Sequence, residues 1–348
     1  MKKLFLTAGL MVGLFVCPLV SSAAFSDVKD GYWAAPVITE LVGKGYMDGY
    51  ADGTFKPNQL TTRAEAAAVM ARTMGISLES SYTCQFTDVV VSDPYYAEIR
   101  KLAELGIIQD AALFNPNELL KRAHISKMIA LAYEIEVDNK NIAKFKDLPK
   151  GYWAKDYIES LADAGVVKGR TATTFEPNSF VTRAHVAALT ARGMEFKQKI
   201  TSYAVAYDYL AKEYIETPHD YAAFEANVLK QVNDIRRAQN LQPFITDVQL
   251  SQLAIIKAKD MIKRGYFEHE SPHYGHPWDM AALFDYEYTS YGENIARNFK
   301  TAKETVDAWM ASPKHRANIL KPSFTHLGVG VQKTKSGNFY VVQQFSSK

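Results

Sequence analysis

Cysteine is nearly absent from this chain of 348 residues, which contains only Cys17 and Cys84. Cys17 lies in an N-terminal leader, so the exported protein would keep a single thiol and cannot form an intramolecular disulfide. With 47% hydrophobic residues, the chain has enough apolar material for ordinary cores, and its length suggests two or three domains.

Long hydrophobic runs are absent after residue 24. None approaches the roughly 20 apolar residues of a membrane span, so the sequence predicts no transmembrane segment. The one long apolar run, residues 4–20, follows a basic start and precedes a small-residue end. This pattern predicts a cleavable signal peptide at residues 1–24 and a secreted protein. Lipidation of Cys17 is an alternative, but Val16 stands where lipoprotein processing requires a small residue.

An excess of charge of either sign is also missing. The formal charge of +2 falls to zero when the two lysines of the leader are removed. Binding to nucleic acid needs a basic face, so the composition argues against a nucleic-acid partner. A GxSxG nucleophile motif is absent too, which argues against the common serine hydrolases.

The first two-thirds of the chain contain three copies of one pattern, which we assign to residues 25–84, 85–144 and 145–199. Each copy opens on a phenylalanine and carries an arginine near its end. These residues are Phe25, Phe86, Phe145, Arg63, Arg122 and Arg183. Three copies at one spacing of about 60 residues indicate a repeated structural unit.

Each copy is predicted to fold as helix, loop, helix. In the first, an apolar stripe at residues 37–42 marks one helix, and Thr62 with Glu65 forms the capping box of the next. Arg63 then falls in the first helical turn, where the helix dipole disfavours a cation. An exposed arginine would explain a single copy, but recurrence in three favours a bound anion such as a carboxylate. The loop at residues 48–52 faintly resembles a calcium loop, although its acidic spacing is wrong.

These segments resemble S-layer homology repeats, through an FxDV opening, GYWA, the loop ADGTFKPN and the TRA of the second helix. The resemblance covers roughly residues 25–196. It implies an all-α pseudo-trimer that binds the pyruvylated secondary cell wall polysaccharide of Gram-positive walls. The ligand-binding residues it implies are Arg63, Arg122 and Arg183 at the ketal carboxylate, with Trp33 and Trp153 as pocket walls. Core packing of the two tryptophans is the alternative.

The second repeat departs from the family pattern. Tyr95-Tyr96 replaces the tryptophan, residues 109–111 replace the glycine-bearing loop, and Lys121 replaces the threonine. The pocket of this repeat is therefore expected to be weakened or purely structural.

The rest of the chain shows a different pattern. Residues 200–220 are predicted to be a helical connector, and residues 221–348 a separate domain. Helices are expected at 224–241 and 250–264, and a β-hairpin turn at 335–338. Helices combined with a terminal hairpin imply a sheet with helical cover.

The C-terminal domain contains the string HExxH at residues 269–273, which zinc peptidases use. That motif binds zinc on a helix, where its two histidines share one face. Pro272 lies inside the string and opposes a helical turn, so the sequence argues against a zinc peptidase.

Three other stretches resemble the CAP superfamily, the cysteine-rich secretory, antigen-5 and pathogenesis-related proteins, in a bacterial form without disulfides. They are GYFEHESPHYGHP at 265–277, YGENIA at 291–296 and WMASPKHRANILKPSFTHLGVGV at 309–331. The resemblance implies an α/β/α sandwich with a cleft in which His269, Glu293 and His315 converge. A second cleft acid of many members is missing, because Met-Ala-Ser follows the tryptophan here.

Three uses of this cleft stay open. His269 and His315 could bind Zn²⁺, or the cleft could bind another ligand. The two histidines with Glu293 could instead catalyse hydrolysis. The third possibility is that the three residues form a polar cluster that orders the loops. We favour a surface protein that is held to the wall by its repeats and displays a CAP-like domain of unknown ligand. The alternative is a wall-anchored hydrolase that acts on peptide or cell-wall substrates through this cleft.

Overall fold

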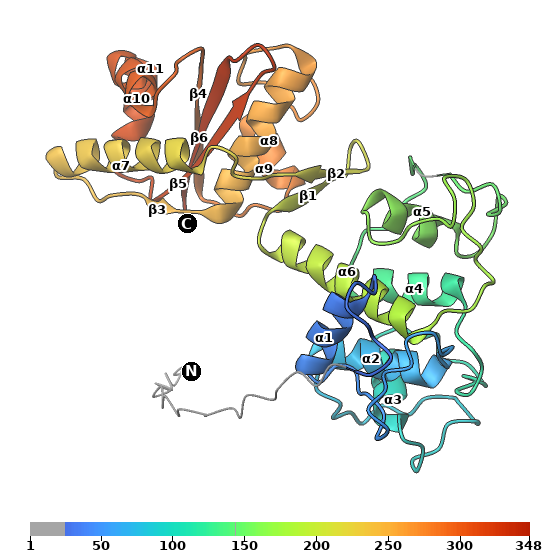
Figure 1. Ribbon diagram of the computed structural model, residues 1–348. Helices are drawn as coiled ribbons and strands as arrows, with labels where there is room; N and C mark the ends of the chain where they lie inside the picture. The colour runs from blue at the N-terminus through green and yellow to red at the C-terminus, as the bar shows by residue number, and fades with distance from the viewer. Residues whose placement is uncertain (1–24, 143) are drawn as a thin grey trace, which may run out of the picture.

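The computed structural model describes residues 25–142 and 144–348, so the predicted signal peptide at 1–24 lies outside the described residues. The N-terminal part is helical, and the C-terminal part is a mixed sheet covered by helices (Figure 1). This confirms the expected fold class, an all-α repeat region followed by an α/β/α domain.

Each repeat contributes a short helix followed by a second, longer helix. The helices are α1 (Ala35–Gly43), α2 (Arg63–Met74), α3 (Tyr96–Glu104), α4 (Arg122–Ala132), α5 (Lys155–Asp163) and α6 (Arg183–Thr201). The second helices α2, α4 and α6 contact one another, while α3 packs on α2, α5 on α4 and α1 on α6. Because the third repeat packs back on the first, the three repeats form a closed pseudo-threefold ring.

Backbone hydrogen bonds close the same ring just before the second helices begin. The amide of Thr61 donates to the carbonyl of Val181, that of Val181 to Leu120, and that of Leu120 to Thr61, at 2.9–3.0 Å. Each repeat thereby satisfies backbone groups of the other two, so an isolated repeat would leave them unpaired.

The predicted capping box opens α2. The side chain of Thr62 accepts a hydrogen bond from the amide of Glu65, and the carboxylate of Glu65 accepts one from the amide of Thr62 at 2.8 Å. The helix ends at Gly75, whose φ of 62° is the left-handed conformation that glycine adopts without strain.

The predicted helical connector is wrong beyond Thr201, where α6 ends. The chain instead forms an antiparallel hairpin of β1 (Val205–Asp208) and β2 (Glu213–Glu216). Val205 and Tyr207, a β-branched and an aromatic residue two positions apart in β1, favour a strand over a helix. The carboxylate of Asp208 stabilises the turn, because it accepts hydrogen bonds from two turn amides at 2.9 and 3.0 Å.

This hairpin contacts both halves of the protein. The hydroxyl of Tyr214 accepts a hydrogen bond from the amide of Glu136 in the repeat region at 2.8 Å. On the other side, Asp208 bonds to His273 Nε2 and to the hydroxyl of Tyr274, both at 2.8 Å. The connector is therefore a structured bridge between the two halves.

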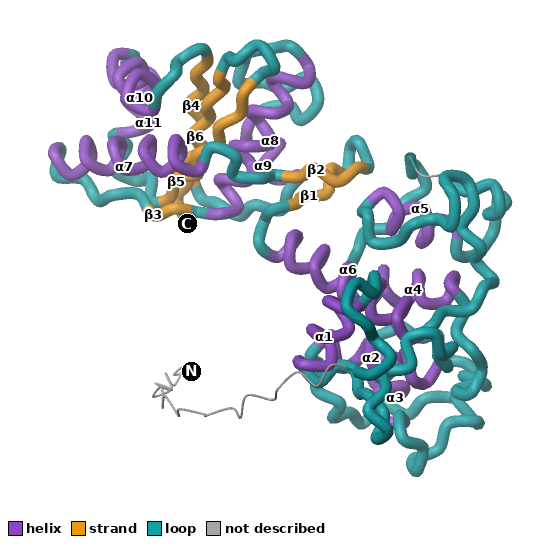
Figure 2. The backbone as a smooth tube through the Cα atoms, in the orientation of Figure 1, coloured by secondary structure: helices purple, strands orange, loops and turns teal. Residues whose placement is uncertain are grey.

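The C-terminal domain is built on a four-stranded sheet of order β3-β5-β6-β4, in which β3 runs parallel to β5 and the other pairs are antiparallel (Figure 2). The elements are α7 (Ala222–Ala238), β3 (Ile245–Thr246), α8 (Val248–Arg264), α9 (Pro277–Leu283), β4 (Ser290–Arg297), α10 (Ala302–Ala311), α11 (Pro313–Ile319), β5 (His326–Lys333) and β6 (Phe339–Ser347). The predicted hairpin joins β5 to β6.

Helices cover both faces of this sheet. α8 packs on β5 and β6 from one side, while α7, α10 and α11 lie on the other (Figure 1). Gly328 and Gly330 let α8 approach closely, because a Cβ at either position would stand 2.2–2.3 Å from the α8 backbone. The sheet thus becomes the buried middle layer, and its β4 strand carries Glu293 into the domain.

Candidate functional site

The three arginines open the second helices, as predicted, and each reaches into the next repeat. Arg63 donates Nε–H to the carbonyl of Phe114 at 2.8 Å, and Arg122 to that of Phe175 at 2.9 Å. Arg183 closes the cycle with a 2.9 Å bond to the carbonyl of Phe55 in the first repeat. Each guanidinium also lies over the ring of the same phenylalanine, 4.2–4.8 Å from its centre.

These contacts give the arginines a structural role that the sequence did not reveal. Burial lowers the pKa of Arg63, and lowers that of Arg122 to about 10, so both remain charged at neutral pH. Arg122 bonds a second carbonyl, that of Lys168, at 3.0 Å. The hydrogen bonds of these guanidinium groups go to carbonyl oxygens, which carry no full charge, so the positive charge at each helix start can also attract an anion.

Arg63 lines a groove built from all three repeats, and we name the equivalent positions around Arg122 and Arg183 in the pseudo-threefold ring the Arg122 and Arg183 grooves. The Arg63 groove, of about 350 Å³, has Gln109, Phe114 and His124 of the second repeat and Trp153 of the third in its wall. The rings of His124 and Trp153 stack at 5.2 Å with an interplanar angle of 30°. Burial, with the charge of Arg63, lowers the pKa of His124 to about 4, so this imidazole is neutral at pH 7.

The Arg122 groove repeats this arrangement one step around the ring. His185 of the third repeat stands where His124 stands in the first groove, and its ring lies 5.5 Å from that of Trp33 of the first repeat. Burial lowers the pKa of His185, as do the nearby charges of Arg170 and Arg122. The same three residue types, arginine, histidine and tryptophan, therefore meet in two grooves.

The Arg183 groove differs at two of these positions. Glu65 takes the place of the histidine, and its carboxylate is engaged in the capping box. Trp33 and Trp153 each lie two residues before a first helix, and Pro94 holds that position before α3. The expectation that Tyr95-Tyr96 replaces the tryptophan is wrong, because the start of α3 places Pro94 at the equivalent position.

The tryptophans are exposed, which answers the alternative of core packing. Trp33 is 54% and Trp153 47% accessible to solvent. Exposed indoles of this kind offer an apolar face for a ligand ring. The second repeat lacks this tryptophan, and the groove that lacks it as a result is that of Arg183. The differences of the second repeat from the family pattern therefore affect several grooves.

In the C-terminal domain, the structure brings His269 and Glu293 together. His269 Nδ1 lies 2.8 Å from Glu293 Oε1, and Gln344 donates to Glu293 Oε2 at 2.7 Å. Glu293 is buried, whereas half of the His269 side chain is exposed. Burial lowers the pKa of His315, and the charge of His269 lowers it further.

The motif residues around this cleft hold its backbone. Asn294 donates to the carbonyl of His315 at 3.1 Å, and Asn318 donates to the carbonyl of Glu293 at 3.2 Å. The HExxH string is not helical, as Pro272 predicts, and His273 turns away to bond Asp208 of the connector. The zinc-peptidase interpretation is therefore excluded by geometry.

Comparison with known families decides the assignment. Residues 24–67, 85–125 and 144–187 match the S-layer homology domain, and residues 229–345 match the Cysteine-rich secretory protein family, CAP. The chain carries three S-layer homology domains followed by a CAP domain. The former indicate a location at the cell surface or in the cell wall.

Three similar proteins each cover part of this chain. The chain is 45% identical over 131 residues to "Uncharacterized protein YkwD" of Bacillus subtilis (strain 168), covering 38% of this chain and 50% of that protein. It is 27% identical over 257 residues to an S-layer protein of Bacillus thuringiensis subsp. finitimus, covering 71% of this chain and 30% of that protein. A solved extracellular protein containing an SCP domain from Bacillus anthracis str. Ames has 27% identity and a TM-score of 0.33, covering 44% of this chain and 50% of that chain. This chain thus spans half or less of the length of each.

The membrane and metal hypotheses can be tested on the described residues. Across 25–142 and 144–348, none of the helices combines the length and apolar character needed to cross a bilayer. Within the same ranges, no three His, Cys, Asp or Glu side chains are placed to hold a metal ion. In the CAP cleft, Oε1 of Glu293 bonds to His269 and Oε2 accepts a hydrogen bond from Gln344, so the carboxylate is held within a hydrogen-bonded cluster.

Sequence reasoning missed two residues that position the CAP cleft. Lys257 is fully buried, and its ammonium donates to the carbonyls of Glu268 and His269 at 2.9 and 2.7 Å. It thereby holds the loop that carries His269. Gln344, on the neighbouring strand, fixes the Glu293 carboxylate. The sequence could have indicated Lys257, because it is a single lysine at a position of α8 that faces the apolar core. Nothing in the sequence indicated Gln344.

Proposed function

We propose that the S-layer homology domains hold this protein on a Gram-positive cell wall by binding its pyruvylated secondary polysaccharide, and that the secreted chain thereby displays its CAP domain. The observation that carries this proposal is the recurrence of arginine, histidine and exposed tryptophan in the Arg63 and Arg122 grooves. The Arg183 groove lacks two of the three groups, so we assign binding to the first two.

The chemistry of the two grooves suits an acidic sugar. A ketal carboxylate would meet a guanidinium edge at a helix start, where the helix dipole also favours an anion. The exposed indole beside it would cover the apolar face of the sugar ring. S-layer proteins among the relatives, such as that of Bacillus thuringiensis subsp. finitimus, support a place at the cell surface.

Removing the tryptophans tests the grooves without disturbing the ring, because both side chains are half exposed. We expect Trp33→Ala combined with Trp153→Ala to weaken binding to purified walls by about tenfold or more, the size of one interface hot spot. Sedimentation of the chain with walls measures this. Trp278→Ala is the matched control, since Trp278 is 51% exposed and lies on the CAP domain. Equal binding by the double variant and this control would show that the two tryptophans do not contribute to the site.

Binding should also strengthen as the pH falls from 7 to 5. His124, with a pKa of about 4 in the free groove, is neutral at pH 7. A carboxylate bound beside it favours the imidazolium and raises this pKa, so the complex takes up protons and gains affinity, by up to about tenfold per pH unit for each groove. The variant with His124→Gln and His185→Gln should lose this pH dependence. Wild-type affinity that is flat or falls over this range would contradict the prediction.

Hydrolysis by the CAP domain is a second candidate, favoured by the 2.8 Å contact between His269 and Glu293, which leaves His269 Nε2 free to accept a proton. We assign the cleft to ligand binding and expect no release of fragments from walls or peptides above background. Release by the wild-type chain that falls by about 100-fold or more in folded His269→Ala would establish the hydrolase instead.

A further inference from the structure

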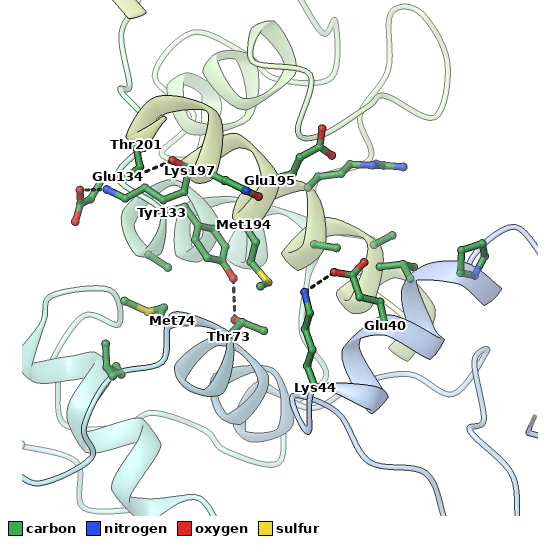
Figure 3. Close-up of a pocket in the computed structure, with 18 of the residues that line it drawn as sticks. Glu40, Lys44, Thr73, Met74, Tyr133, Glu134, Met194, Glu195, Lys197 and Thr201 are labelled. Atoms are coloured by element: carbon green, nitrogen blue, oxygen red, sulfur yellow. Dashed lines mark hydrogen bonds and ion pairs between the residues drawn. The ribbon is translucent and has the colours of Figure 1, made fainter. Parts of the chain in front are cut away.

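A groove of about 930 Å³ opens between α1 and α6, beside the C-terminal ends of α2 and α4 (Figure 3). Met74 and Met194 lie in its wall, and the hydroxyls of Thr73 and Tyr133 bond to each other there at 2.8 Å. Its charged edges carry the ion pair of Lys44 with Glu40 at 2.6 Å and that of Lys197 with Glu134. We call this groove the linker slot, because linkers of the chain fill the two equivalent places in the ring.

The pseudo-threefold ring shows that the slot is open in only one of three equivalent places. Ala71, Ala130 and Ala191 each stand eight residues after the arginine of their repeat. The first two are 1% exposed, whereas Ala191 is half-buried and lines the slot. A first helix packs on each of the three second helices, so the difference comes from the chain that follows them.

That chain takes two different paths. Gly75 after α2 and Glu134 after α4 have φ values of 62° and 53°, and this left-handed turn sends the linker toward the next repeat. Glu195 holds the equivalent position in the third repeat, and there α6 continues as a helix to Thr201. In the described chain, no linker therefore follows the third repeat along α1, and only Ile76 at the start of the first linker borders the slot.

The two filled places show what such a slot binds. Both linkers begin with apolar residues at alternate positions, Ile76 and Leu78 in one, Ile135 and Val137 in the other, and these pack on the core. The next first helix holds the linker backbone: Arg100 of α3 donates to the carbonyl of Leu78 at 3.1 Å. Ser160 of α5 accepts from the amide of Asp138 at 3.1 Å.

We propose that the linker slot is a docking site for an extended peptide segment of another polypeptide, with Ile, Val or Leu at alternate positions. Glu40 on α1 holds the position of Ser160 on α5, six residues into the helix, so its carboxylate can accept a backbone amide as Ser160 does. The exposed part of Ala191 and the two methionines receive the apolar side chains. The slot lies apart from the CAP cleft, and it shares Trp33 with the Arg122 groove.

A peptide copied from the first linker tests this directly. Residues 75–83, GISLESSYT, carrying a fluorophore, would be titrated with the full chain and followed by anisotropy. We expect saturable binding with a Kd of roughly 10–1000 µM, and binding at least about tenfold weaker for the peptide with Ile76→Asp and Leu78→Asp. Absence of saturation by the wild-type pair at millimolar concentration would overturn the proposal.

Variants of the chain locate the binding. Ala191→Trp fills the slot and should weaken binding at least about tenfold. Val37→Asp on α1 should do the same, and serves where Ala191→Trp lowers the unfolding temperature. Ala308→Trp on α10, also at a half-buried helical alanine, is the matched control and should bind as the wild type does. Unchanged peptide binding by both slot variants would place the peptide elsewhere and refute the proposal. Self-association of the chain that Ala191→Trp abolishes would assign the slot to a second copy of this chain and would also refute it.

Discussion

The hydrogen bond from each arginine to a phenylalanine carbonyl of the next repeat is the interaction on which the repeat region depends. Arg63, Arg122 and Arg183 donate these bonds at 2.8–2.9 Å around a closed cycle. A cation at a helix start is unfavourable by a few tenths of a kcal/mol or more, and the buried carbonyls offset that cost. The same bonds fix each guanidinium, so that its remaining edge is oriented before any ligand arrives.

A single repeat consequently cannot form one of these grooves. The arginine of one repeat, the histidine of the next and the tryptophan of the third meet in the Arg63 and Arg122 grooves. The substitutions of one repeat are therefore distributed over different grooves. The absence of a tryptophan at Pro94 affects the groove of Arg183, far from Pro94 in sequence, while Gln109 changes the groove of Arg63.

Much of the fold could be predicted because it is determined by residues that are close in the sequence. The capping box of Thr62 and Glu65, the helical C-terminal elements and the hairpin before Phe339 each depend on neighbouring residues, and the structure confirms them. The prediction of a helical connector was wrong because its apolar residues fit a helical stripe as well as a strand. Hydrogen bonds to Glu136 and His273 select the strand. The composite grooves and the buried role of Lys257 depend on contacts between distant segments, which a single sequence does not contain.

The connector and the two domains give the protein a defined arrangement. Asp208 bonds the hairpin to the CAP domain and Tyr214 bonds it to the repeats, so the CAP cleft is held at a set position relative to the grooves of the repeats. The cleft itself is ordered by Lys257 and Gln344, two groups that touch the loop of His269 and the carboxylate of Glu293. Anchoring and display are thus separate tasks of separate domains.

Isothermal titration of the full chain with a pyruvylated monosaccharide tests the central claim most directly. Two equivalents of sugar per chain are predicted, one for each groove in which arginine, histidine and tryptophan meet. Three equivalents would show that the arginines alone suffice, and no binding would show that their hydrogen bonds to the phenylalanine carbonyls are their whole role.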